Sequence, residues 1–363
     1  MKNKAKFPFK PDYTVLPGET LAETLEAKGM TQKDLAARTD LTPKHINKII
    51  KGESPITPAT ALAFERVLGV DASFWNNLEK NHQERSARIK ETKELESSIG
   101  WMRKFPIKDM VKNGWLGKFD DEIEQLKALL NHFGISSPSQ WGSVFAKPQA
   151  SFRKSATHPS KPEPLSAWLR QGEIEARKLR CKSYDADKFG EIQTRLRDLT
   201  RETDPRSFIA KLRNDCAECG VAVVFVPEVP GTCVFGVTKW LGDKALIQLS
   251  LRQKANDIMW FTFFHEAGHI ILHGKKESFL ENNGPKDAKE KEADAYAANL
   301  LIPPKSYRKF VKTGNFSAGA VQKFALEMGI APAIVVGRLH HEEKLPYNQL
   351  TGFKVYYKFA SNN

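Results

Sequence analysis

His265-Glu266-Ala267-Gly268-His269 is the stretch of this 363-residue chain that says most about its fold and chemistry. Residues four apart on an α-helix lie on one face, so the two imidazoles of this stretch project together. The acidic residue after the first histidine lies where a metal-bound water needs a general base. Apolar runs flank the stretch, from Trp260 to Phe264 and from Ile270 to Leu272. The pattern predicts a buried helix that holds one metal ion and a base.

A catalytic zinc site needs a third protein ligand besides His265 and His269. His273 continues the four-residue spacing, but it lies eight residues beyond His265. That separation is about 12 Å along a helix, too far for both side chains to share one ion. We therefore interpret His273 as a helix-end residue. Leu272 and Lys275 stand where a metzincin needs glycine and histidine, which excludes that class.

The acidic helix predicted over residues 289–298 is a better source of the third ligand. Its apolar face, which includes Ala293, Tyr296 and Ala297, must pack on the core. Glu292 borders that face, so its carboxylate is a candidate ligand. The same position is also compatible with an ordinary solvated acid.

The N-terminal part of the chain has the pattern of a helix-turn-helix. A short helix is predicted over residues 31–38, and a second one begins at Pro43, with Thr42 as its N-cap, and ends before Gly52. Ile46 and Ile49 supply the buried face of the second helix. Its other face is polar and basic, with Lys44, His45, Asn47, Lys48 and Lys51. Such a helix suits the major groove of DNA, although an ordinary helical hairpin fits the same spacing.

Four segments between residues 12 and 80 resemble the Cro/C1-type (Xre) family, and within it the HigA and VapA antitoxin regulators. They are LPGE at 16–19, MTQKDLA at 30–36, IIKG at 49–52 and ITPATAL at 56–62. The resemblance implies that dimers bind palindromic operators through the second helix. It also implies that Gln32 and Thr42 contact phosphates, and that base edges or backbone are contacted by Lys44, His45, Asn47 and Lys48. Asp40 replaces the usual glycine of the turn, and we expect the turn to survive because Asp tolerates a left-handed backbone.

The C-terminal part resembles the ImmA/IrrE family of zinc metallopeptidases over about residues 207–338. The motifs that carry the resemblance are FTFFHEAGHIILHG at 261–274 and EADAYAANLLIP at 292–303. The resemblance implies that Zn²⁺ is held by His265, His269 and Glu292 and that Glu266 is the catalytic base. It further implies that Asp294 orients a histidine ligand.

Composition places the chain among globular proteins, with 40% hydrophobic and 27% charged residues. The sequence contains no run of 18 apolar residues and no secretory leader, so we expect a cytoplasmic protein without a membrane span. The net charge of +13 is spread along the chain and suits an anionic partner. Four scattered cysteines, including the Cys216/Cys219 pair, are interpreted as packed or incidental thiols, with metal or redox use as the alternative.

The predicted architecture is mainly helical, with an α+β C-terminal domain. Residues 1–96 form the all-helical DNA-binding head and a connecting helix, and residues 97–206 a helical middle region with a Pro-rich loop. Residues 207–363 form the peptidase domain, whose small sheet packs on the metal-binding helices. Its strands are predicted at 221–226, 234–240, 245–249 and 353–359. A second helix-turn-helix pattern over residues 321–340 is interpreted as a packing element, with His340 and His341 on the surface.

The predicted function is a DNA-binding transcriptional regulator of HigA-like antitoxin type that carries a zinc-dependent endopeptidase. Its expected partners are double-stranded operator DNA, a second copy of the chain, and a regulatory protein or cognate toxin as substrate. The alternative is a non-catalytic antitoxin or repressor in which the peptidase-like domain acts as a sensor or binds a toxin. The intact set of His265, Glu266, His269 and Glu292 favours the enzyme.

Overall fold

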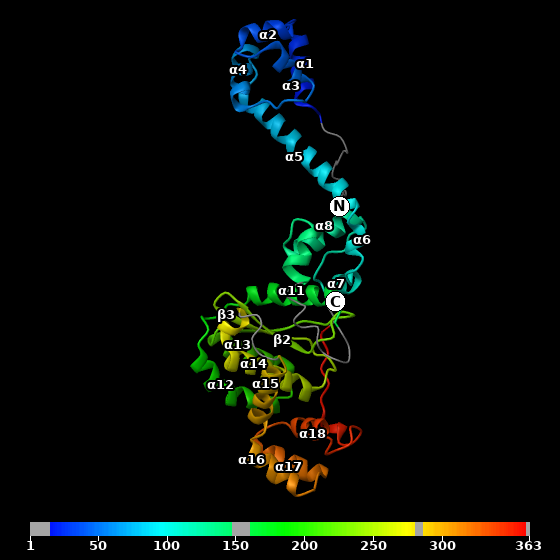
Figure 1. The fold of residues 1–363 in the computed structure, drawn as a ribbon, viewed down its shortest axis with the longest axis vertical. Coiled ribbons are helices and arrows are strands. Elements are labelled where there is room, and N and C mark those ends of the chain that lie inside the picture. The colour runs from blue at the N-terminus through cyan, green and yellow to red at the C-terminus, as the bar shows by residue number, and fades with distance from the viewer. Residues whose placement is uncertain (1–14, 147–159, 280–285, 361–363) are drawn as a thin grey trace, which may run out of the picture. The chain divides into compact units, whose positions relative to one another are not determined.

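The computed structural model of the chain describes residues 15–146, 160–279 and 286–360. The chain divides into two compact units, Met1–Gly100 and Trp101–Asn363. The described part of the first unit is helical, whereas the second adds a three-stranded sheet (Figure 1). This confirms the predicted fold class, mainly helical with a small sheet in the C-terminal region.

The N-terminal unit, called the head below, is a bundle around one apolar core. Its helices are α1 (Pro17–Ala27), α2 (Gln32–Arg38), α3 (Pro43–Ile50), α4 (Pro58–Leu68) and α5 (Ala72–Glu96). Fully buried side chains from all five helices form the core, among them Leu21, Leu35, Ile46, Phe64 and Trp75. The ring of Trp75 meets that of Phe64 edge-on at 5.5 Å, a favourable aromatic geometry.

Local capping explains where the helices of the head begin. The Thr31 side chain accepts a hydrogen bond from the Asp34 backbone N–H, and the Asp34 carboxylate accepts one from the Thr31 backbone N–H, which makes a capping box at the start of α2. Thr42 caps α3 in a similar way, accepting from the His45 backbone at 3.2 Å, and a proline opens that helix. The turn between them forms with Asp40 outside the left-handed region, so the glycine conformation is not needed here.

The C-terminal unit is larger and begins with short helices. Its elements up to the sheet are α6 (Ile99–Met102), which starts at the boundary, α7 (Ile107–Lys112), α8 (Glu122–Phe133), α9 (Pro138–Trp141), η1 (Gly142–Ala146), α11 (Pro162–Lys178), α12 (Ala186–Asp198), η2 (Leu199–Arg201) and α13 (Pro205–Glu218). From the sheet onward they are β1 (Val221–Phe225), β2 (Gly236–Leu241), β3 (Lys244–Leu249), α14 (Asn256–Phe279), α15 (Lys286–Leu301), α16 (Pro304–Lys312), α17 (Ala318–Met328), α18 (Pro332–His341) and η3 (Thr351–Phe353).

The sheet has the strand order β1-β3-β2, with β1 parallel and β2 antiparallel to β3. Alternate residues of the buried β1 strand point to opposite faces. Val221 and Val223 join the core formed with α13 and α14, whereas Ala222 and Val224 pack with Trp168 of α11. The sheet is therefore covered by helices on both faces, and β2 lies at its edge.

The C-terminal tail differs from the predicted strand over residues 353–359. Its only strand-like pairing is an isolated antiparallel bridge, Tyr356 to Ala255, and Lys354 pairs with Asp257 at 2.7 Å. These contacts attach the tail to the start of α14. His340, expected on the surface, is 1% exposed instead, and its Nε2 lies 2.9 Å from the Gln349 carbonyl oxygen.

Among the described residues no single helix is long and apolar enough to cross a membrane. The bent pair α17 and α18 reaches that length and hydropathy only together, across a bend of 113°. Apolar side chains from both helices are buried in the core of the unit, among them Val321, Phe324, Val335 and Leu339. This agrees with the interpretation of the pair as a packing element.

Candidate metal centre

The helix α14 carries both histidines of the HEAGH stretch, and burial of its apolar face fixes their direction. Trp260, Phe263, Phe264 and Ala267 are fully buried in the core. The helical conformation is interrupted at Gly274, whose φ of 61° is not helical, so the regular turn ends directly after His273. His265 and His269 lie on the partly exposed side of this segment, facing α15.

Gly268 lets α15 approach this face of α14 closely. A Cβ atom at Gly268 would lie 3.1 Å from the Tyr296 ring and 3.3 Å from the Ala293 Cα, closer than ordinary van der Waals contact. Ala293 and Ala297 of α15 are fully buried. Small residues on both helices therefore bring the acidic first turns of α15 over the two histidines.

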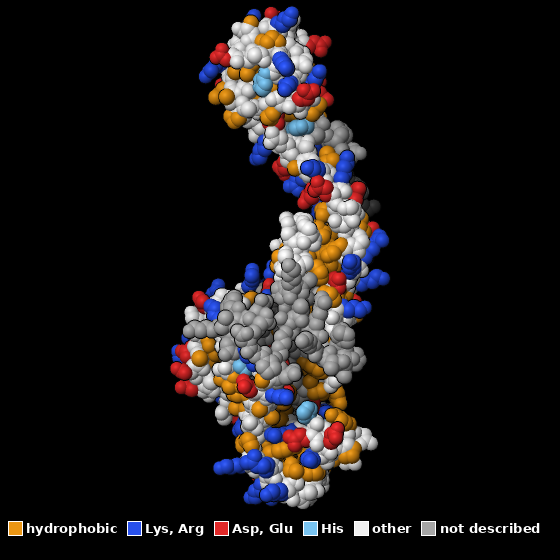
Figure 2. Space-filling model, in the orientation of Figure 1, with side chains coloured by type: hydrophobic (Ala, Val, Ile, Leu, Met, Phe, Trp, Pro, Cys, Tyr) orange, Lys and Arg blue, Asp and Glu red, His pale blue; other side chains and the backbone are white. Residues whose placement is uncertain are grey.

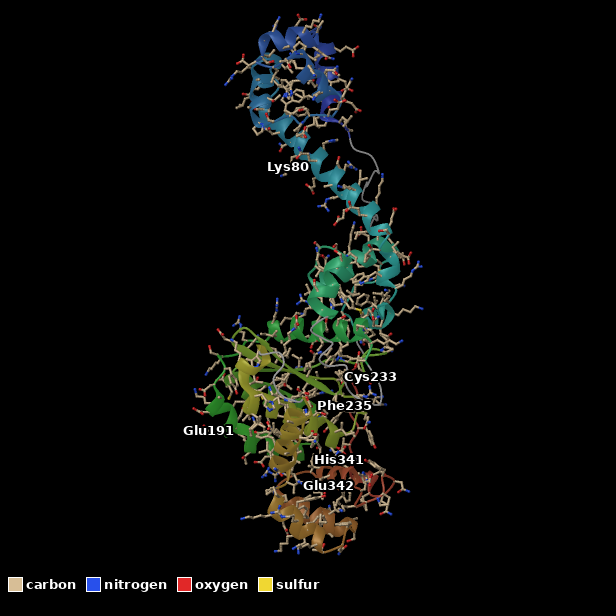
Figure 3. The ribbon with its side chains drawn as sticks, in the orientation of Figure 1. Lys80, Glu191, Cys233, Phe235, His341 and Glu342 are labelled. Atoms are coloured by element: carbon tan, nitrogen blue, oxygen red, sulfur yellow. The ribbon has the colours of Figure 1, made fainter. Side chains whose placement is uncertain are left out.

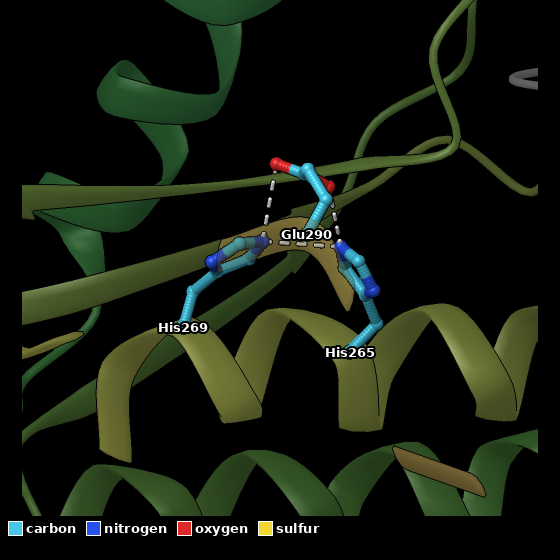
Figure 4. A group of neighbouring side chains, drawn as sticks. All are labelled: His265, His269 and Glu290. Carbon is cyan, nitrogen blue, oxygen red and sulfur yellow. Dashed lines mark hydrogen bonds and ion pairs between the residues drawn. The ribbon is translucent and has the colours of Figure 1, made fainter. Parts of the chain in front are cut away.

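Three side chains converge where the two helices meet: His265, His269 and Glu290 (Figure 4). The two Nε2 atoms are 3.1 Å apart, and the two oxygens of the Glu290 carboxylate each face one of them, Oε2 at 3.2 Å from His265 Nε2 and Oε1 at 3.6 Å from His269 Nε2. Ligand atoms bound tetrahedrally to zinc at about 2.0–2.1 Å are separated by roughly 3.3 Å. The geometry and the nitrogen and oxygen donors therefore fit a zinc ion.

Asp294 supports the first histidine from its other side. Its carboxylate lies 2.8 Å from His265 Nδ1, one helical turn after Glu290. A carboxylate on the second ring nitrogen fixes the tautomer that leaves Nε2 free to bind a metal. This contact corresponds to the orienting role predicted for Asp294 from the sequence.

Glu292 is placed differently from its predicted role as a ligand. It is not among the three converging donors, and its carboxylate lies 3.0 Å from His273 Nε2. His273 Nδ1 in turn lies 3.1 Å from His269 Nδ1. The structure thus links Glu292 to His269 through His273, while Glu290 occupies the position between the two histidines.

Glu266 lies beneath the histidines and is 7% exposed. Its carboxylate accepts a hydrogen bond from the Thr238 hydroxyl at 2.7 Å, which β2 presents to α14. A Cβ atom at Gly236 would lie 3.0 Å from the same carboxylate, so the glycine leaves room for it. Burial raises the pKa of Glu266, and the nearby His265 and His269 offset part of that shift.

The electrostatics of the three donors favour a bound cation. Burial would lower the pKa of His265, but hydrogen bonds to Asp294 and Glu290 raise it to about 10. Hydrogen bonds to His265 and His269 hold the pKa of the Glu290 carboxyl far below its usual range. The two shifts are the two sides of the same contacts: the carboxylates favour positive charge on His265, and the histidines favour the ionised form of Glu290.

The six residues predicted to contact DNA lie around the helix-turn-helix of the head. Lys44, Lys48 and Thr42 are exposed, and His45 is partly exposed. Asn47 is half-buried, and its side-chain amide donates to the Gln32 side chain at 3.4 Å, which links α3 to α2. This arrangement leaves the cations of α3 accessible.

The four cysteines are free within the structure, and Cys216 and Cys219 are buried. Burial raises the pKa of both thiols, most strongly for Cys216. A protonated, buried thiol is a poor nucleophile and a poor metal ligand. These facts agree with the interpretation of the pair as packed thiols.

Comparison with known proteins identifies two domains in the chain. Residues 21–75 match the family described as helix-turn-helix, and residues 244–327 match a peptidase family described as the IrrE N-terminal-like domain. The chain is also similar to virulence-associated protein I of Dichelobacter nodosus, with 38% identity over 64 residues. That match covers 17% of this chain and 59% of the relative, so the chain spans less than two thirds of the relative's length. The chain thus combines a DNA-binding domain with a domain of metallopeptidase type.

Sequence reasoning missed Glu290, Thr238 and the role of His273. One available signal was the spacing of Glu290 and Asp294, which lie four residues apart like the two histidines they face. Ala293 lies between them in the sequence, and its small, buried side chain marks the face of α15 that approaches α14. No comparable local signal pointed to Thr238, because only the packing of β2 on α14 brings it to Glu266.

Proposed function

We propose that this chain is a cytoplasmic transcriptional regulator of HigA-like antitoxin type that carries a zinc-dependent endopeptidase. In this proposal residues 1–96 bind operator DNA as a dimer, and residues 207–363 cut a specific regulatory protein or toxin. Residues 97–206 connect these two regions in the sequence. The observation that carries the proposal is the buried Glu266 beside three converging metal donors.

We assign the zinc ligands as His265, His269 and Glu290, with Glu290 in place of Glu292. The support is the convergence of one donor atom from each of the three side chains, all within 4.8 Å of one another. Asp294 is assigned to orient His265, and the pair of His273 and Glu292 to orient His269.

When bound, the ion would supply Lewis-acid chemistry to water and to a peptide carbonyl. Glu266 takes a proton from the attacking water while the water oxygen forms a bond to the carbonyl carbon. The same carboxyl then gives the proton to the amide nitrogen as the C–N bond breaks. The Thr238 hydroxyl fixes one carboxylate oxygen, which leaves the other to handle the proton. Burial raises the pKa of Glu266, which makes its carboxylate a stronger base.

We propose that the head reads a palindromic operator through α3, with Lys44, His45, Asn47 and Lys48 facing base edges or backbone. Gln32 and Thr42 are assigned to phosphates. The exposed cations of α3 support this assignment, because Lys and Arg contacts to phosphates supply most of the affinity for DNA.

We expect the peptidase to act on one partner protein and not on general substrates such as casein. Unrestricted proteolysis by a regulator would destroy the proteins of its own cell. A repressor or toxin encoded near the gene is the substrate we propose, and a non-catalytic toxin-binding domain is the rival.

Glu266→Gln is the variant that separates the two functions. It should retain zinc, since Glu266 is not a ligand, and lose cleavage by about 10²- to 10⁴-fold because no base remains. Zinc content and regulation in cells are measured against wild type. If the variant represses, derepresses and neutralises a toxin as wild type does, the catalytic proposal fails and the binding-module proposal stands.

A further inference from the structure

The helix α16 carries an exposed row of cations that neither proposed activity uses. Lys305, Arg308, Lys309 and Lys312 are all exposed, and their spacing of three and four residues places them along one side of the helix. On the opposite side Tyr307 and Phe310 are buried, and Phe310 stacks on Phe324 of α17 at 4.2 Å. Packing on α17 therefore fixes this cationic row in an outward direction.

The charge of this row is not neutralised locally. The sequence has no Asp or Glu between Asp294 and Glu327. Within the described part of the chain, none of the four α16 cations has a carboxylate within 4 Å. Glu342, labelled in Figure 3, lines a pocket with Arg308 and Lys312, but its carboxylate pairs with Arg338 at 3.0 Å. Blue side chains accordingly gather over α16 at the lower left of Figure 2.

We propose that this surface, the outward row of cations on α16, is a second DNA-binding site that contacts the phosphate backbone without reading sequence. The row from Lys305 to Lys312 extends about 10 Å along the helix, the length of about three nucleotide steps of one DNA strand. Flexible Lys and Arg side chains on a fixed helix can follow a phosphate backbone of that spacing.

The chemistry of the surface favours DNA over an acidic protein partner. Protein interfaces depend on buried aromatic and aliphatic anchors surrounded by a polar rim. On α16 the aromatic side chains, Tyr307 and Phe310, are already buried within the unit. The outward side of the helix offers cations and no large apolar anchor, which is the composition of a phosphate-contacting surface.

DNA bound by the helix-turn-helix domain is the ligand that reaches this second surface. Once the head is bound, the linked C-terminal unit experiences a high effective concentration of the flanking duplex. A surface too weak to bind DNA alone then adds affinity and holds the peptidase near the operator. The inference therefore rests on DNA binding by the head.

The test measures binding of the full chain to a 60-base-pair duplex of random sequence, by fluorescence anisotropy at two salt concentrations. The test variant is Lys305→Gln/Arg308→Gln/Lys309→Gln/Lys312→Gln. A matched control removes four cations that are already paired with acids: Arg103→Gln/Lys127→Gln/Lys188→Gln/Lys211→Gln. All three proteins are measured with the wild-type head and with Lys44→Ala/Lys48→Ala.

We expect the α16 variant to bind the duplex at least about tenfold more weakly in both backgrounds. The slope of log affinity against log salt should decrease by about 0.9 for each phosphate that the variant no longer neutralises. The control should weaken binding much less, since its cations are neutralised within the chain. Equal losses of affinity in the two variants would mean that only the net charge of the chain matters for DNA binding. No loss of affinity in the α16 variant would leave an acidic protein as the partner of this surface. Either result overturns the proposal. Failure of the head is recognised separately, by unchanged binding of the Lys44→Ala/Lys48→Ala protein.

Discussion

The two proposed functional regions of this chain are built in opposite ways. In the head, the side chains assigned to DNA project from α3 into solvent, and the core beneath them is apolar. In the metal centre, the assigned side chains contact one another across two helices and a strand. The proposed DNA contacts of the head are therefore separate outward charges, whereas the groups of the candidate metal centre form one connected network.

This difference predicts how each region responds to change. A network in which each group orients the next loses its function when one member is removed. Independent surface cations lose affinity in steps, one phosphate at a time, and the loss depends on salt. Substitutions in the two regions can therefore distinguish a cooperative site from an additive one.

The largest effect is expected from Glu290→Gln, which should reduce zinc affinity by more than about a hundredfold because a ligand is removed. Glu292→Gln should keep most of the zinc, since its carboxylate contacts His273 and not the converging donors. Zinc content after dialysis and competition with a chromogenic chelator measure both variants. Full occupancy in Glu290→Gln together with loss of zinc in Glu292→Gln would restore the assignment made from sequence.

That pair of variants also marks the limit of what the sequence could predict. Helical periodicity places the histidines at 265 and 269 on one face, because they share one helix, and the motif around them predicts Glu266 as the base. The third ligand comes from another helix, which offers three acids near its apolar face: Glu290, Glu292 and Asp294. Choosing among them requires the rotation of α15 about its axis, which the contact of Gly268 with Ala293 determines.

The same limit applies to the rest of the fold. The sheet strands and the helix-turn-helix were predicted closely, since turn residues and alternation are local signals. The tail was overpredicted as a strand, because Phe353–Phe359 alternates in sequence but finds only one bridging partner at Ala255. His340 was misplaced because its burial depends on the Gln349 carbonyl that closes over it.

His273→Ala should lower zinc affinity by about 10- to 100-fold, the usual effect of removing a group that orients a ligand. His269 would keep its Nε2 but lose the partner at Nδ1 that holds its ring. His341→Ala, at an exposed histidine of α18, is the matched control and should leave zinc binding unchanged. Equal affinities for wild type and His273→Ala would show that the network does not extend beyond Asp294.

Acid should destabilise the C-terminal unit through His132. Burial lowers the pKa of this histidine to about 4, against a weaker opposing effect of its contact with the Ala167 carbonyl. Between pH 6.5 and about 4, His132 is protonated in the unfolded chain but not in the folded one. The stability that is present above pH 6.5 is therefore lost as the pH falls. The free energy of unfolding should fall by about 2 kcal/mol between about pH 7 and pH 5 from this group.

Denaturant titrations of wild type and His132→Gln at the two pH values measure this effect. The variant loses packing against Trp115 and is less stable at neutral pH, but its stability should change less with pH. Arg170 and Glu173, which pair at 2.9 Å beside His132, remain in both proteins. The same pH dependence in the two proteins would mean that other groups, such as carboxylates, cause the acid sensitivity.

The smallest effect is expected in the head, from Lys44→Ala/Lys48→Ala. Each lysine that contacts a phosphate should lower the salt slope of operator binding by about 0.9, and the pair should weaken binding roughly tenfold at moderate salt. Each single variant should account for about half of this in free energy, because independent surface charges add. A collapse of binding in one single variant, with no further weakening in the double, would mean that the two lysines act as one unit. The head would then resemble the metal centre, and the contrast between additive and connected sites would fail.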